Sequence, residues 1–290
     1  MSGPTYIRPH TLDEALRHLS DWGDRAHLLA GGTDLLVQMR SGESSPQCVI
    51  DISAVGELEG LRLVDDAVRI GALVTHSEIS ASRILKRRAS VLADASAEVG
   101  SVQVRNLATL GGNIGNASPC ADTVPALYVL DAEIHLASSE GDRWLPIAEF
   151  FTGPGESVRC PRELITAVRF PALEEEHLGF FQKIGQRRKM RVSKASVAGN
   201  VSLDDDTVTE CRLALGSVAP TVIRATEAED YLVGRPLSVE TIDETAALAS
   251  GATRPITDIR STAEYRRRII QVMVSRGLSR LKEEFIDRKR

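Results

Sequence analysis

Two pairs of adjacent glycines, each set between apolar runs, constrain this chain more than any other feature of its sequence. The first pair lies in HLLAGGTDLL, residues 27–36, where a strand-like run meets two glycines, a threonine and an aspartate before a helix-like LLVQM. The second lies in NLATLGGNIGNASPCADTVPAL, residues 106–127, which has neither helical nor strand periodicity. Adjacent glycines adopt backbone conformations closed to other residues and let the main chain approach a ligand closely. Both stretches are therefore predicted to be loops held by flanking elements.

The chemistry of these loops favours a phosphate-bearing ligand. A strand, a glycine turn and a helix N-terminus in succession aim backbone N–H groups at one point, which suits a phosphate. The second loop adds hydrogen-bonding side chains at Thr109, Asn113, Asn116 and Ser118, and Asp122 can accept from ligand hydroxyls. Neither loop contains the G-x-G-x-x-G fingerprint or the phosphate loop of nucleotide hydrolases. A single glycine pair between apolar segments is more often just a tight turn. The two pairs together predict that both stretches bind one diphosphate.

Length and composition describe an ordinary globular protein. The 290 residues, 42% hydrophobic and 26% charged, are enough for two or three domains with good cores. No apolar run approaches the length of a membrane span, and the N-terminus lacks the pattern of a secretory signal. The net charge of -5 argues against general nucleic-acid binding.

The four cysteines are scattered, at Cys48, Cys120, Cys160 and Cys211. No C-x-x-C pair is present, so no iron–sulfur or zinc ligation by this chain is expected. Reduced thiols in a cytoplasmic protein fit this spacing.

The periodicities divide the chain into three α+β segments. Residues 1–57 form a βαβ-like unit around the first glycine loop, with Thr11 capping the first helix. Residues 58–173 contain a hairpin that turns at Asp65-Asp66, the second glycine loop and further paired strands. Residues 178–290 contain three strands followed by helices, whose starts are predicted at the capping boxes Thr226-x-x-Glu229 and Ser261-x-x-Glu264.

The wording of the loops, AGGTDLL followed by TLGGNIGNASPCAD, resembles the FAD-binding medium subunit of the molybdenum hydroxylase family, which includes bacterial xanthine dehydrogenase and aerobic carbon monoxide dehydrogenase. Further matching segments are FFTGPGE, ELITAVRFP, FFQKIGQRR, ALGSVAPTVIRATEAEDYL and STAEYRRRIIQVMVSR. The resemblance implies an α+β protein with the two-subdomain FAD-binding fold of the vanillyl-alcohol oxidase type. A C-terminal three-stranded antiparallel sheet with helices, the carbon monoxide dehydrogenase flavoprotein domain, would follow.

The resemblance also implies a non-covalent FAD site. The first loop is similar to the segment that wraps the pyrophosphate, and the second loop resembles the opposite jaw. The aspartate of the S-P-x-x-D loop would accept from the flavin or its ribityl chain, an apolar strand residue would pack on the cofactor, and a lysine would lie beside it. The residues carried over are His27, Leu28, Leu29, Ala30, Gly31, Gly32, Thr33, Asp34, Thr109, Leu110, Gly111, Gly112, Asn113, Ser118, Asp122, Ile165 and Lys183.

Several of these residues have simpler interpretations. Asp34 and Asp122 are also suited to capping a helix N-terminus. Lys183 is also suited to be an edge-strand charge that discourages aggregation, whereas the family pattern implies an ammonium that stabilises reduced flavin. In some relatives a charged loop, here starting at Arg187, influences the acceptor, and a tyrosine near Val192 shields the ring; this chain has no such tyrosine.

The implied function is electron transfer. Flavin would receive electrons from [2Fe-2S] clusters of a small subunit, which in turn serves a large molybdopterin subunit, and would pass them to NAD or another acceptor. The family usually forms a dimer of such heterotrimers. No side chain here is required as a general acid, base or nucleophile, and no metal ligands are expected. A stand-alone FAD oxidoreductase and a non-redox nucleotide-binding module are the alternatives. The cysteine-rich insertion of the hydroxybenzoyl-CoA reductase branch is absent.

Overall fold

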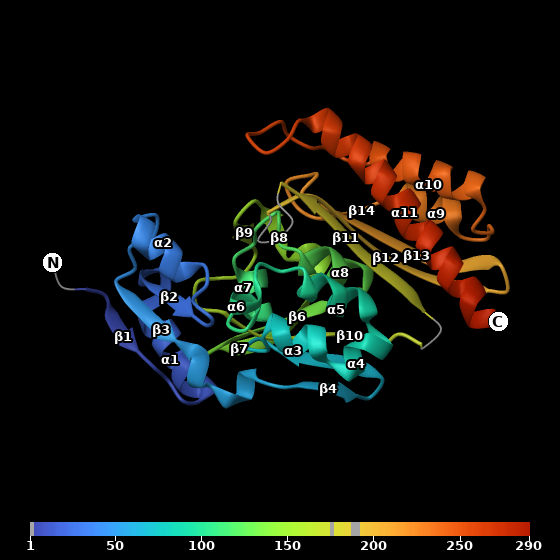
Figure 1. Cartoon of the computed structure of the whole chain (residues 1–290). Helices are drawn as coiled ribbons and strands as arrows, with labels where there is room; N and C mark the ends of the chain where they lie inside the picture. Colours follow the sequence, from blue (N-terminus) through green and yellow to red (C-terminus); the bar gives the residue numbers. More distant parts are fainter. Residues whose placement is uncertain (1–2, 175–176, 187–191) are drawn as a thin grey trace. The chain divides into compact units, whose positions relative to one another are not determined.

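In the computed structural model, which describes residues 3–174, 177–186 and 192–290, the chain forms both helices and strands (Figure 1). The strands are β1 Thr5–Ile7, β2 Ala26–Leu29, β3 Cys48–Asp51, β4 Leu61–Val64, β5 Ala67–Gly71, β6 Glu133–Ser138, β7 Gly141–Pro146, β8 Phe151–Gly153, β9 Glu156–Ser157, β10 Leu164–Pro171, β11 Leu178–Gly185, β12 Ser193–Asp204, β13 Thr207–Gly216 and β14 Ile223–Arg224. The helices are α1 Leu12–Trp22, α2 Leu35–Ser41, α3 His76–Ala81, α4 Arg83–Arg88, α5 Ser90–Ala97, α6 Val102–Arg105, α7 Leu110–Gly115, α8 Thr123–Val129, α9 Thr226–Leu232, α10 Val239–Gly251 and α11 Ala263–Lys289. None of the helices in the described ranges is both long and apolar enough to cross a membrane.

The chain divides into two compact units, and each is assembled from three separate segments. Unit 1 comprises Met1–Glu78, Val102–Ala117 and Ala132–Pro171, and unit 2 comprises Ile79–Ser101, Ser118–Asp131 and Ala172–Arg290. The division into consecutive domains 1–57, 58–173 and 178–290 stays a prediction. The description below treats each unit by itself.

The N-terminal part of unit 1 is the predicted βαβ arrangement. Its three strands form a parallel sheet in the order β1-β3-β2, with α1 connecting β1 to β2. Thr11 caps α1 as predicted, because its hydroxyl accepts a hydrogen bond from the Glu14 N–H at 3.2 Å. The apolar face of α1 packs on β3, which is buried along its whole length.

The second sheet of unit 1 is antiparallel, in the order β4-β5-β10-β6-β7. The two predicted hairpins are confirmed as β4–β5 and β6–β7. Asp65 and Asp66 turn the first with φ of 48° and 60°, the left-handed conformation that two-residue hairpin turns require. One core cluster joins α1 and β3 to β6 and β10 through Leu16, Ile50, Ala137 and Leu164. The glycine loops therefore rest on a single packed body.

Unit 2 is built on an antiparallel sheet in the order β11-β12-β13-β14. The three predicted strands are confirmed, and the two-residue strand β14 adds a fourth. Phe180 on β11 and Val197 on β12 share a core with helices α9, α10 and α11. The opposite face carries α5 and α8, and α8 is buried at every residue. Figure 1 shows these two helix groups on opposite sides of the sheet.

Two predicted helix caps are wrong. Helix α9 begins after Ala225 without a side-chain cap, because Glu229 instead accepts hydrogen bonds from the Leu213 N–H and from Arg224. Helix α11 is capped by Thr262, one residue after the predicted Ser261. At α9 a tertiary contact takes the glutamate away from the predicted capping box. At α11 the hydroxyl of the next residue accepts the capping hydrogen bond.

Candidate functional site

The first glycine loop joins β2 to α2 in unit 1 and leaves several backbone donors unused. Gly32 has φ of +67°, and a Cβ there would lie 2.9 Å from Cδ1 of Leu36, so glycine is required on both counts. Within the described residues, no protein group accepts a hydrogen bond from the N–H groups of Thr33, Asp34 or Leu35. Neighbouring N–H groups at the start of a helix attract an anion. The loop therefore has the donor set that a phosphate needs.

The second glycine pair, also in unit 1, does not lie in a loop as predicted, because Gly111 and Gly112 are within the short helix α7. We keep the name second glycine loop for this stretch, whose N–H donors are used internally. Thr109 caps α7 through a hydrogen bond that its hydroxyl accepts from the Gly112 N–H at 3.1 Å. The N–H groups of Leu110 and Gly111 donate to the carbonyls of Val74 and Ala72, at 3.0 and 2.9 Å. This loop is thus fixed to the antiparallel sheet, and its own N–H groups are not a free donor set comparable with that of the first loop.

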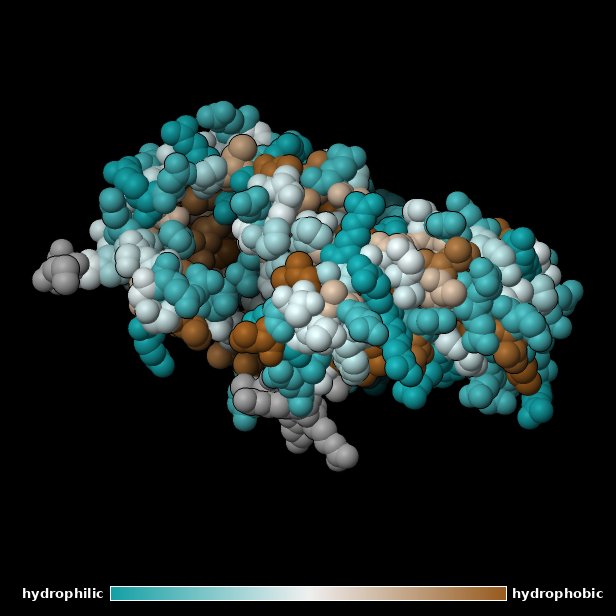
Figure 2. All heavy atoms as spheres, turned by 90° about the horizontal axis from the view of Figure 1, so that it is seen from above, coloured by the Kyte–Doolittle hydropathy of each residue, from teal (hydrophilic) through white to brown (hydrophobic). Residues whose placement is uncertain are grey.

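The structure brings the two loops together. A Cβ placed on Gly31 would lie 1.8 Å from the carbonyl oxygen of Leu107, just before the second glycine pair. Only a residue without a side chain permits this approach. Figure 2 shows a hollow with hydrophobic residues at its bottom toward the left, where Figure 1 places the N-terminal elements. The contact of Gly31 with Leu107 fits the expectation that both loops face one ligand.

Two further predicted residues of unit 1 border these loops. Ile165 lies at a bulge in β10, and its Cδ1 would be 3.6 Å from a Cβ placed on Gly115 at the end of α7. His27 begins the predicted segment in β2, and its buried Nδ1 has no hydrogen-bond partner among the described residues. Ile165 is therefore placed beneath the helix of the second loop, as a packing residue rather than a polar contact.

The predicted residues of unit 2 form a separate buried ion pair. Lys183 Nζ donates to Asp122 Oδ2 at 2.5 Å and to the Glu98 carbonyl at 2.5 Å, while the Ser193 hydroxyl donates to Asp122 Oδ1 at 2.6 Å. The Lys183 side chain is 0% exposed. Burial raises the pKa of the Asp122 carboxyl, and Lys183 and Ser193 act in the opposite direction. An edge-strand charge would point to solvent, so that interpretation of Lys183 is wrong.

The capping interpretations of the two aspartates are also excluded. Asp34 and Asp122 both stand at N-cap positions, but neither side chain caps its helix. Asp34 accepts a hydrogen bond from Gln38 Nε2 at 2.7 Å. Ser118, on the predicted S-P-x-x-D loop, accepts from the Cys120 N–H at 3.3 Å and so shapes that loop.

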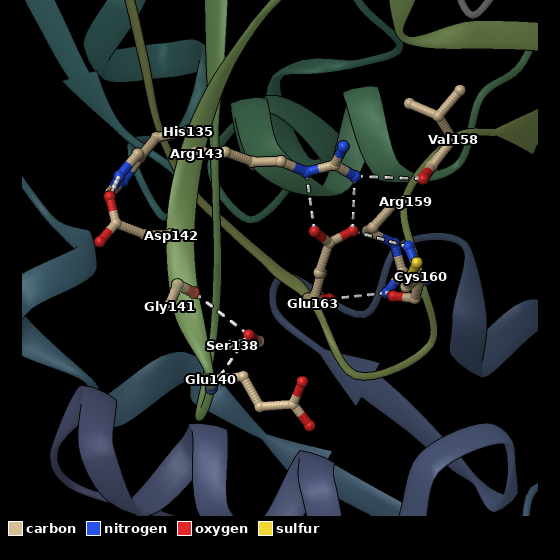
Figure 3. Close-up of polar contacts among 10 residues, drawn as sticks. All are labelled: His135, Ser138, Glu140, Gly141, Asp142, Arg143, Val158, Arg159, Cys160 and Glu163. Carbon is tan, nitrogen blue, oxygen red and sulfur yellow. Dashed lines mark hydrogen bonds and ion pairs between the residues drawn. The ribbon is translucent and has the colours of Figure 1, made fainter.

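A cavity of about 620 Å³ in unit 1 is a different feature. It is bordered by residues 20–25, 138–140 and 160–163, and no predicted site residue lines it. Figure 3 shows Glu163 at the centre of its polar contacts: it binds Arg143 through both oxygens and accepts from the Cys160 N–H. These contacts fold the 160–163 turn on itself, and the lining mixes acidic and basic side chains without selecting one ligand class.

Sequence reasoning missed three participants. The Leu107 carbonyl lies against Gly31, and the Glu98 carbonyl accepts a hydrogen bond from Lys183. The Ser193 hydroxyl, on β12, donates to Asp122. Backbone carbonyls have no sequence signature, and a serine in a strand is ordinary. The charged loop expected to start at Arg187 lies outside the described residues, and Val192 is exposed.

Comparison with known proteins matches two consecutive parts of the chain to two family models. Residues 2–173 match the model of the FAD binding domain in molybdopterin dehydrogenase, and residues 180–281 match the CO dehydrogenase flavoprotein C-terminal domain. The chain is 34% identical over 277 residues to the xanthine dehydrogenase FAD-binding subunit of Escherichia coli O157:H7, covering 95% of this chain and 94% of that one. It is 30% identical to the carbon monoxide dehydrogenase medium chain of Afipia carboxidovorans, covering 96% of each.

A solved structure extends the likeness to the fold. The carbon monoxide dehydrogenase from Hydrogenophaga pseudoflava, in a form lacking the Mo-pyranopterin moiety, superposes with a TM-score of 0.92 at 30% identity, over 96% of each chain. The family model spans most of the chain, and the fold is the one that the loops and sheets build here. The chain therefore belongs to the FAD-binding subunits of the molybdenum hydroxylase family of oxidoreductases.

Proposed function

We propose that this chain binds one FAD non-covalently and seats its diphosphate on the first glycine loop. The unused N–H groups of Thr33, Asp34 and Leu35 carry the proposal, because they lie beside the contact of Gly31 with Leu107. A doubly charged diphosphate binds such donors strongly. The second loop would contact the cofactor through the side chain of Asn113 and through van der Waals contacts, rather than through its N–H groups.

The remaining predicted contacts to FAD belong to the same proposal. Ile165 would pack on the cofactor from β10, and Ser118, Asp122 and Lys183 would meet its flavin or ribityl part. Asp122 and Lys183 satisfy each other as a buried pair, so support for their place at the cofactor comes from the family resemblance. The pair would hold its lysine and its carboxylate in fixed positions.

We further propose that the chain is the electron-transfer subunit of a cytoplasmic complex. Bound FAD supplies the ability to take up single electrons and to release two together. The donors would be [2Fe-2S] clusters of a small subunit, serving a large molybdopterin subunit, and the electrons would pass to NAD or another acceptor. A dimer of heterotrimers is the proposed assembly. Support comes from two relatives, of which one is an FAD-binding subunit and the other a medium chain of a dehydrogenase.

A flavin titration tests the FAD proposal. The purified chain is expected to be yellow and to release FAD on denaturation. FAD, FMN and riboflavin are then added to the flavin-free chain, and ADP is used as a competitor. If the diphosphate provides the main polar contact, riboflavin binds at least about 100-fold more weakly than FAD, which corresponds to about 3 kcal/mol, and ADP displaces FAD.

Each other outcome identifies an alternative. A folded chain that binds ADP as tightly as FAD would be a nucleotide-binding module. A yellow chain that turns over a substrate with oxygen, without molybdenum or iron, would be a stand-alone oxidoreductase. Equal affinity for riboflavin and FAD would remove the first glycine loop from the site.

A further inference from the structure

The segment between α10 and α11 exposes large apolar side chains. Ile259 is 95% exposed, Ile256 is 69% exposed, and Tyr265 in the first turn of α11 is 43% exposed. In Figure 1 this segment projects beyond the helices of unit 2. We call residues 254–261 together with Tyr265 the isoleucine turn. Three large apolar side chains exposed in one short segment are the kind of surface that marks an interaction site.

The isoleucine turn is fixed by hydrogen bonds. Asp258 Oδ1 accepts from the N–H groups of Arg260 and Ser261, at 2.9 and 3.0 Å, and from the Arg266 guanidinium at 2.8 Å. These donors lower the pKa of Asp258 to about 2, so the carboxylate is charged at neutral pH. The backbones of Asp258 and Ser261 also pair with each other.

Arg266 connects the turn to the sheet of unit 2. It is 4% exposed, and its guanidinium also donates to the carbonyls of Lys194 and Ser217, at 3.1 and 2.7 Å. The turn therefore presents its isoleucines from a rigid base. A preformed apolar projection loses little conformational entropy on binding, which favours a docking role over a loose surface loop.

The positive charge around the turn indicates which charge the surface of its partner should carry. Four exposed arginines lie in or just after the turn, whereas the whole chain has a net charge of -5; they are Arg254, Arg260, Arg267 and Arg268. Of these, Arg260 also pairs with Asp258 at 3.4 Å. Of the acidic residues of the turn and the start of α11, Asp258 is held by Arg266 and Glu264 is exposed. A complementary surface would combine an apolar pocket with a rim of carboxylates. A second copy of this acidic chain would have to bring its own basic turn against the first, or use another face.

We propose that the isoleucine turn docks into an acid-rimmed apolar pocket on another subunit of the same dehydrogenase complex. This inference rests on the proposed function in one respect, namely that the chain works within such a complex. Ile259 would be the central buried contact, and the flanking arginines would set orientation and the rate of association.

The test is assembly of the native complex around a tagged full-length chain. Wild type, Ile259→Asp and Ile286→Asp are expressed in the native cells, and the purified material is assayed for FAD, iron and molybdenum, with the accompanying chains identified by mass spectrometry. Ile286 is the control residue: it is 41% exposed, and the helical rise places it about 30 Å along α11 from Tyr265. We expect Ile259→Asp to keep its FAD but to lose iron and molybdenum at least about tenfold relative to FAD. The control should match wild type.

The outcomes separate this inference from the proposed function. Unchanged iron and molybdenum in Ile259→Asp would overturn the docking role, as would a wild-type chain that carries FAD but no metal-bearing partner. Loss of self-association in Ile259→Asp, with metals unchanged, would overturn it in favour of a second copy. Metals that co-purify with wild type but not with Ile259→Asp, in material without FAD, would uphold the docking role and reject the FAD proposal.

Discussion

At the scale of single residues, the ion pair of Lys183 with Asp122 changes what a substitution there would measure. Lys183→Met leaves the Asp122 carboxylate buried without its cation, which typically costs about 3–5 kcal/mol. We expect urea unfolding to show a loss of this size. A double variant that also carries Asp122→Asn removes the stranded charge and should recover most of it. If Lys183→Met alone were as stable as wild type, the pair would not be buried as described.

This stability effect bears on the proposed influence of Lys183 on the flavin. A shift in flavin potential in Lys183→Met alone would mix the loss of the ammonium with the exposure of an unpaired carboxylate. The double variant separates the two, because both charges are then absent. The informative comparison is therefore the flavin potential of Asp122→Asn against that of the double variant, because these two proteins differ only in the Lys183 ammonium.

His76 predicts a dependence of stability on pH. The ring is 0% exposed, neither ring nitrogen has a partner among the described residues, and burial lowers its pKa from 6.5 to about 4. The unfolded chain therefore binds a proton that the folded chain does not between pH 6.5 and pH 4, so stability falls as the pH is lowered through this window. The loss is about 2 kcal/mol at pH 5 and about 3 kcal/mol at pH 4.

The measurement is urea unfolding of wild type and His76→Leu at pH 7.5 and pH 5. Carboxylates titrate in both proteins, so the difference between them isolates the histidine. We expect the variant to gain about 2 kcal/mol on wild type between these two pH values. An equal loss in both proteins would mean that the ring is protonated in the folded state.

At the scale of elements, the close contact between the glycine loops gives a prediction for Gly31→Ala. The added methyl would lie 1.8 Å from the Leu107 carbonyl, so one loop must move. We expect FAD affinity to fall at least about tenfold and stability to fall by about 1–3 kcal/mol. Gly56→Ala is the control, since a Cβ there meets nothing within 4 Å. Full FAD affinity in Gly31→Ala would place the cofactor away from this contact.

Some of the structural elements could be predicted from the sequence and others could not. The hairpin at Asp65-Asp66, the α1 cap at Thr11 and three of the strands of unit 2 follow from local patterns, and the structure confirms them. The cap at Thr226 failed because Glu229 binds Leu213 and Arg224, and the cap at Ser261 failed because the Thr262 hydroxyl takes that role. Strand β14 is two residues long, too short for any periodicity to reveal.

The candidate site shows the same limit. The glycine pairs marked the loops, and the family resemblance supplied Asp122 and Lys183, but no pattern in the sequence indicated that these two would bind each other. Their meeting depends on how α8 packs on the sheet of unit 2, which is a long-range property. The unequal use of N–H donors by the two loops likewise depends on Val74 and Ala72, more than thirty residues before the second loop.

At the scale of the whole molecule, the interleaved units predict that the chain cannot be divided at the boundary of its two matched families. A fragment of residues 1–173 keeps α5 and α8 but lacks all four strands that cover them. Helix α8 is buried at every residue in the full chain, so the fragment would expose the side of α8 that packs on β12 and β13. We expect the fragment to aggregate when expressed alone.

Co-expression provides the control for this prediction. The complementary fragment of residues 174–290 is expected to bring the first fragment into solution, because together they contain every segment of unit 2. Sedimentation and circular dichroism measure the result. A fragment 1–173 that is monomeric and folded by itself would show that the first two predicted domains are independent of the third.

The interleaving of the units also governs events on the ribosome. Because synthesis proceeds from the N-terminus, α8 emerges before any strand of the sheet that buries it. The stretch from Leu130 to the end of β13 at Gly216 takes about 4–17 seconds to translate at ordinary rates. During that interval a helix that is fully buried in the finished fold has no sheet to pack against. Production of this protein should therefore depend on chaperones that hold nascent chains, and on the speed with which the part of the message for residues 130–216 is read.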